Sequence, residues 1–195
     1  EASKKFFSER LLREAGRLGI DLKLQPEPLY SLDESKAWVE AAKTDGVDGL
    51  MVMVHDRQEH SWPTAALATD SGIPTVVYSP LGTSFTTNTA AFDHKPGCVV
   101  YSTDDFDRAL FGMKMLGSGA RLKKSRCVVI RGEERKETPL ADTGITLRYV
   151  PAKTFLEIYQ AMPDSSDVHA LAQHYVGTAR RRTGATERDV LNGAK

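Results

Sequence analysis

Residues 47–54 read Val-Asp-Gly-Leu-Met-Val-Met-Val, and this stretch decides the fold. Its apolar residues fall on both faces of an extended strand, so a strand formed here needs cover on both sides. That requirement is typical of a central strand in a parallel sheet. A helical pattern follows from about Pro63 to Ser71, and a second apolar strand pattern follows at 74–78. This alternation predicts a parallel α/β fold with right-handed crossover connections.

The amino-terminal side of this stretch continues the alternation. Apolar residues recur at helical spacing through 3–18, and a short strand is expected at 21–25. Ser31 and Glu34 have capping-box spacing, which predicts a helix through about Ala42. An α/β fold usually opens with a strand before its first helix. We therefore expect this chain to be a fragment of a longer protein.

The carboxyl-terminal side restarts the same pattern after a pair of glycines in 117–119. We predict a three-layer α/β/α doubly wound domain over 1–120 and the start of a second, similar α/β unit over 121–195. The expected elements are a polar loop at 79–95, a strand at 97–101, a helix capped by Ser102 and Asp105 to about Leu116, strands at 126–131 and 145–150 around a charged loop or short helix at 133–142, and helices at 153–161, 166–181 and from 186.

Composition excludes some partners. The 26 Lys and Arg residues balance 26 Asp and Glu residues, so no basic field exists to hold a nucleic acid. No stretch approaches the ~20 apolar residues of a membrane span. We expect a cytoplasmic protein with neither nucleic acid nor membrane as a partner. Cys98 and Cys127 lie in apolar runs, which predicts two buried free thiols.

Ligands of open α/β sheets bind beyond the carboxyl ends of the strands, and this rule selects three segments. The first, 55–62, offers His55, Arg57 and Trp62 together with a carboxylate. An indole can cover the apolar face of a sugar, while charged groups bind its hydroxyls. Packing is the alternative, because Trp62 precedes Pro63 at a helix start and His55 can simply cap the strand.

The second segment, 79–89, has seven hydroxyl or amide side chains among eleven residues, Thr83 and Asn88 included. These suit a neutral polyol, or a phosphate bound through backbone amides, although no nucleotide motif is present. A plain surface loop is the alternative. The third candidate is Arg131, beside Gly132, where solvated ion pairing is the alternative. We predict a small sugar or polyol as the ligand, and no metal site within this chain.

Several segments resemble the amino-terminal and middle domains of the L-fucose and L-arabinose isomerase group. These segments are 47–52 with the His/Trp loop after it, 71–77, 108–131 and 175–195. The resemblance implies two similar α/β/α units followed by a third domain. It also implies a role for Trp62 as a sugar-stacking residue, with His55 and Arg57 beside it.

Enzymes of that group interconvert aldoses and ketoses through an enediol. A divalent metal, usually manganese, stabilises the developing negative charge, and a carboxylate moves the proton. The metal and acid–base residues of the family come from later domains, so no catalytic residue is carried over and the chain alone is expected to be inactive. The family's amino-terminal domain often completes a neighbouring subunit's sugar pocket, which implies a homo-oligomer.

Two other functions fit the same sequence. Residues 48–52 and 71–77 also suit a sugar-binding or sensor domain resembling type I periplasmic binding proteins and repressor effector domains. A leader peptide or a DNA-binding headpiece upstream would favour that alternative. The third possibility is an assembly domain without a ligand, which a large apolar patch over the strand ends would favour.

Overall fold

A computed structural model describes residues 2–55, 57, 59–92 and 94–195, the first two as backbone only. The chain divides into two compact units, Glu1–Ser125 and Arg126–Lys195, here called the first and second units. The expected boundary at 120 falls within a helix, α5 (Asp107–Lys124), and the division follows that helix. Each unit combines helices with a sheet, which confirms the α/β class.

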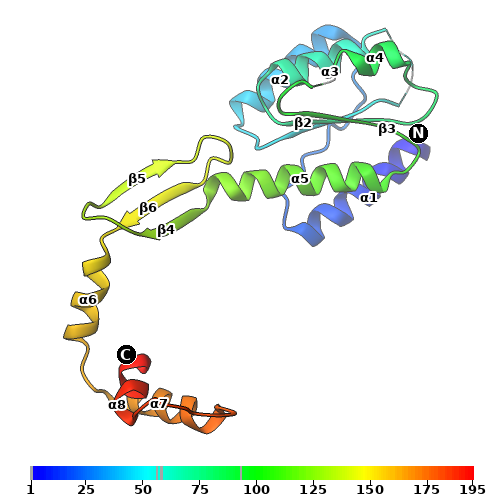
Figure 1. The fold of residues 1–195 in the computed structure, drawn as a ribbon. Coiled ribbons are helices and arrows are strands. Elements are labelled where there is room, and N and C mark those ends of the chain that lie inside the picture. The colour runs from blue at the N-terminus through cyan, green and yellow to red at the C-terminus, as the bar shows by residue number, and fades with distance from the viewer. Residues whose placement is uncertain (1, 56, 58, 93) are drawn as a thin grey trace. The chain divides into compact units, whose positions relative to one another are not determined.

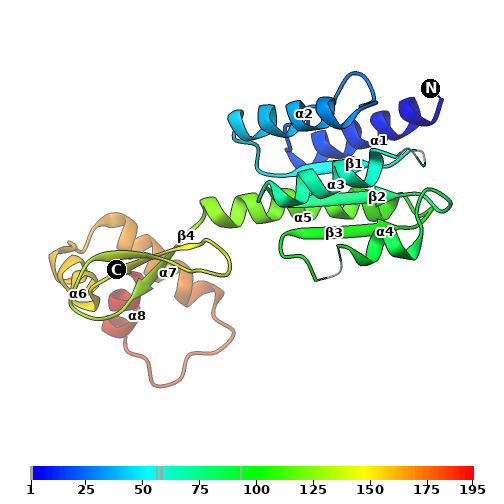
Figure 2. The same cartoon turned by 90° about the horizontal axis from the view of Figure 1, so that it is seen from above.

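The first unit is built on three parallel strands, which lie side by side in Figure 2. They are β1 (Leu50–Met53), β2 (Thr75–Ser79) and β3 (Cys98–Ser102), in the order β1-β2-β3. All five residues of β2 are buried. The predicted central strand is thus shorter than expected, and in the described sheet β2, not β1, holds the middle position.

Helices lie on both faces of this sheet (Figures 1 and 2). Val77 of β2 packs in a cluster with α2 (Leu32–Thr44) and α3 (Ser61–Asp70). Its neighbour Tyr78 packs in a second cluster with α1 (Ala2–Leu18) and α5. Successive residues of a strand point to opposite faces, so the two clusters are the two sides of one sheet.

Only some of the helices and strands predicted from local sequence signals in the first unit are present as expected. The Ser31–Glu34 capping box is present at the start of α2. The expected box at Ser102 is not formed, because α5 starts later and has Phe106 at its N-cap. The loop at 79–95 contains a short helix, α4 (Thr86–Ala90). Residues 21–25 belong to no helix and no sheet, so the prediction of a strand there is wrong.

The second unit contains a mixed sheet in the order β4-β6-β5. β4 (Arg126–Ile130) and β6 (Thr146–Val150) are parallel. β5 (Lys136–Pro139) pairs antiparallel with β6, so the charged segment expected to be a loop or helix contains a strand. The sheet is followed by α6 (Ala152–Ala161), α7 (Ser166–Thr178) and α8 (Glu187–Ala194).

The two thiols are free but not buried as predicted. Cys98 is partly buried on β3, and Cys127 is exposed on β4. Both strands lie at an edge of their described sheets, so an apolar sequence run was not enough to bury either thiol. Among the described residues, no helix is both long and apolar enough to cross a membrane.

Candidate functional site

The loops after the three strands of the first unit meet at the carboxyl edge of the sheet. The Ser84 hydroxyl lies 2.8 Å from the Ser102 hydroxyl at the end of β3. The Leu81 backbone N–H donates to Asp104 Oδ1 at 2.8 Å. These two contacts tie the loop after β2 to the loop after β3. Ser102 and Asp104 were not predicted as site residues, although the strand-end rule applied to β3 would have selected both.

Arg57 ties the loop after β1 to the same place. Its Nε–H donates to the Gly82 carbonyl, and its guanidinium carbon lies 4.7 Å from the centroid of the Phe85 ring. Gly82 has a φ of +90°, which favours glycine. Phe85 is 59% exposed. The predicted residue Arg57 therefore supports Phe85, an exposed aromatic residue that was not among the predicted site residues.

The two predicted polar residues of the second segment, Thr83 and Asn88, mainly hold that loop in shape. The Thr83 hydroxyl donates to Pro80 O at 2.7 Å, so the buried Ser79 hydroxyl donates to Thr83 Oγ1 at 2.7 Å. Asn88 Oδ1 accepts from the Phe85 N–H at 2.9 Å. These bonds position Phe85, and the Ser84–Ser102 hydroxyl pair is more exposed than the Ser79–Thr83 pair.

His55 lies at the end of β1 with one side covered. Its ring stacks on Phe7 of α1, with centroids 5.8 Å apart and planes at 25°. This partial burial lowers the pKa of His55, and repulsion from Lys4 lowers it further, because both disfavour the imidazolium. At neutral pH the ring is therefore a neutral hydrogen-bonding group.

Trp62 is partly buried and packs against the core of the first unit. It stands in the first turn of α3, and its ring centroid lies 5.6 Å from that of buried Phe92. Its indole nitrogen is buried and has no hydrogen-bond partner among the described residues. This placement favours the packing alternative over sugar stacking.

The remaining predicted groups lie elsewhere or are not described. Arg131 belongs to the second unit, where its side chain is exposed and its N–H donates to Val150 O at 3.1 Å. Asp56 and Gln58 of the first segment lie outside the described residues. In the part of the chain that is described, no three His, Cys, Asp or Glu side chains gather closely enough to hold a metal ion.

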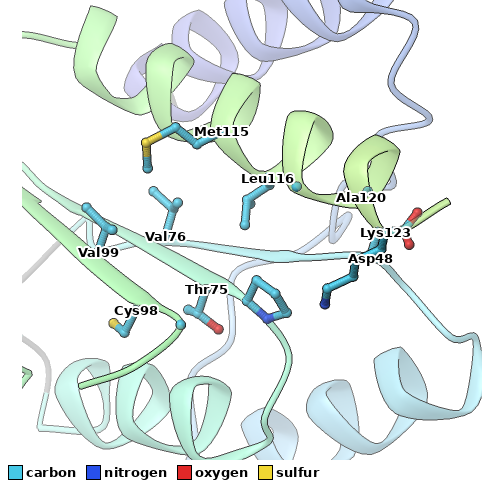
Figure 3. Close-up of a pocket in the computed structure, with 12 residues that line it drawn as sticks. Asp48, Thr75, Val76, Cys98, Val99, Met115, Leu116, Ala120 and Lys123 are labelled. Carbon is cyan, nitrogen blue, oxygen red and sulfur yellow. The ribbon is translucent and has the colours of Figure 1, made fainter. Parts of the chain in front are cut away.

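A cavity of about 230 Å³ lies at the opposite, amino edge of the same sheet, beneath α5 (Figure 3). Val76, Val99 and Leu116 give it an apolar wall, and Asp48 and Lys123 bring charges to its lining. None of the predicted site residues lines it. The carboxyl edge remains the candidate site, because hydroxyl, carboxylate, guanidinium and aromatic groups converge there.

The chain was compared with protein-family models, with curated proteins and with solved structures, and none of the three comparisons found a match.

Proposed function

We propose that the first unit binds a small sugar or polyol at its carboxyl edge, as the amino-terminal part of an aldose–ketose isomerase-like protein. The observation that carries this proposal is the exposed Phe85 ring beside the accessible Ser84–Ser102 hydroxyl pair. An aromatic ring can cover the apolar face of a pyranose or furanose. Hydroxyls and a carboxylate at its rim then bind the sugar hydroxyls.

The polar groups of the site bind each other in the ligand-free protein. A sugar hydroxyl that replaces the Ser84–Ser102 contact exchanges one neutral hydrogen bond for another, at little net cost. The Asp104 carboxylate has acceptor capacity beyond its bond from Leu81 N. Affinity therefore depends mainly on the apolar contact with Phe85. We assign the stacking role to Phe85 instead of Trp62.

We propose that the first unit is a three-layer, doubly wound domain and that the second unit begins a similar one. We assign no catalytic step to this chain, because the resemblance carries no catalytic residue over to it. Manganese and the proton-moving carboxylate would belong to later domains of a longer protein. The chain alone would be inactive and would contribute sugar binding and homo-oligomer assembly.

The test is titration of the ¹⁵N-labelled chain with L-fucose, L-arabinose and glycerol, followed by NMR. We expect the two sugars to shift amide signals of residues 81–85 and 102–104 at millimolar concentrations. Phe85→Leu should weaken binding about two- to tenfold, because one stacked aromatic contact contributes about 0.5–1.5 kcal/mol. Phe111→Leu is the matched control, since Phe111 is also exposed but lies on α5.

Three outcomes would contradict the proposal. One is the absence of any shift with either sugar. Another is a set of shifts confined to the amino-edge cavity. The third is equal weakening by Phe85→Leu and Phe111→Leu, which would show that the effect is not local to the site.

A further inference from the structure

One edge of β1 has backbone groups without a strand partner. The N–H groups of Leu50 and Val54 donate to Pro74 O at 2.8 Å and Tyr78 O at 2.9 Å, both toward β2. Alternate residues of a parallel strand direct their backbone groups to opposite sides. Met51 and Met53 therefore direct theirs away from β2, where the described residues provide no pairing strand.

A second backbone without a strand partner belongs to residues 21–25. They lie in neither a helix nor a sheet, and no backbone–backbone hydrogen bond joins them to another described residue. Leu22 and Leu24 alternate with three polar residues, which is the pattern of a strand with one covered face. This segment therefore has the sequence pattern of an edge strand, but no described strand is hydrogen-bonded to it.

Contacts at its two ends show which way this segment runs. Ile20 lies against Gly117, near the end of α5 and thus at the amino edge of the sheet. At the other end, Lys4 Nζ donates to Pro26 O, and His60 Nε2 lies 2.7 Å from Leu29 O at the carboxyl edge. The segment thus crosses the sheet in the direction of β1, and five residues of a strand would span roughly 17 Å there.

The segment and β1 border the same side chains. Ile20, Leu22, Met51 and Met53 all pack against one cluster beneath α1 and α5. Two parallel backbones thus share a helix layer without being hydrogen-bonded to each other. We infer that one more parallel β-strand fits between residues 21–25 and β1, a position we call the slot.

The start of α1 identifies the occupant of the slot. Lys4 reaches Pro26 and Phe7 stacks on His55, so α1 begins at the carboxyl edge of the sheet. A strand parallel to β1 ends at that same edge, directly where α1 begins. The occupant is therefore an apolar strand of about five residues joined covalently to the amino end of α1. With it the sheet has the doubly wound order 2-1-3-4-5, in which residues 21–25 are strand 2.

Hydrogen exchange of the 195-residue chain tests the slot without any variant. The amides of Met51 and Met53 should exchange at least about tenfold faster than those of Leu50 and Val54, because only the latter pair with β2. Equal protection of the four amides would overturn the inference, since it would mean that β1 already has a partner on both sides.

A designed extension tests the occupant. The sequence Lys-Val-Val-Ile-Val-Val-Gly, placed before Glu1, should slow exchange of the Met51, Met53 and Leu22 amides at least about tenfold, independently of protein concentration. A Gly/Ser extension of equal length is the matched control and should change nothing. Three results would overturn the inference: no protection by the apolar extension, equal protection by both extensions, or protection that appears only as protein concentration rises.

Discussion

Gly112 of α5 lies so close to β2 that a side chain has no room. A Cβ built there would stand 2.6 Å from Val76 Cγ1 and 3.3 Å from Tyr101 Cε2. Val76 is buried and β-branched, so its methyl groups cannot rotate away cheaply. Gly→Ala in a helix interior ordinarily raises the free energy of unfolding by about 1 kcal/mol, whereas overpacking a core lowers it by about 1–3 kcal/mol. We expect Gly112→Ala to lower the free energy of unfolding by about 1 kcal/mol.

Gly119→Ala is the control within the same helix, because nothing lies within 4 Å of a Cβ at Gly119. It should raise the free energy of unfolding by up to about 1 kcal/mol, so the two variants should differ by about 2 kcal/mol. Urea unfolding followed by tryptophan fluorescence measures this, since Trp38 and Trp62 both lie in the first unit. Equal stability of the two variants would refute the reasoning, as would a lack of coupling between Gly112→Ala and Val76→Ala.

Two further predictions concern polar groups of the first unit. Thr64 Oγ1 lies 2.7 Å from both Ser35 Oγ and His60 O, so Thr64→Val should cost about 1–2 kcal/mol in the same urea assay; unchanged stability would contradict this. The His55 pKa is lowered in the folded state, so the unfolded chain takes up this proton first and stability should fall as pH drops below about 6.5. NMR titration checks this: Phe7→Leu should raise the pKa, and an ordinary pKa in the unmodified chain would contradict the prediction.

Periodicity and capping signals predicted most elements of the first unit, because its helices and strands bury the faces that the pattern marks. The sequence failed where tertiary packing outweighs local preference. A pair of glycines in 117–119 indicated a helix end, yet α5 continues to Lys124. A Cβ at Gly117 would stand 2.8 Å from Ile20 Cδ1, so close packing explains this glycine better than a break in the helix does.

The strand-end rule selected loops at the carboxyl edge of the sheet but not the aromatic residue that the structure exposes there. Trp62 and Phe85 both follow strands, and the local sequence offers one hint between them, the helix start at Pro63 beside Trp62. The difference lies in their neighbours: the partly buried Trp62 packs against Phe92 of the core, whereas Arg57 reaches across from another loop to Phe85 at the surface. Contacts between segments distant in sequence decide such a choice, and one sequence without its fold does not contain them.

The carboxyl end of the slot lies at the same edge of the sheet as the candidate site. α1 lies on one face of the sheet and α3, which follows β1, lies on the other. If a strand before α1 occupies the slot, helices leave it and β1 on opposite faces, and the carboxyl ends of these two strands form a switch point. His55 and Arg57 stand at that point. The completed sheet should therefore bind the same sugars more tightly than this chain does, and Phe85→Leu should still weaken that binding.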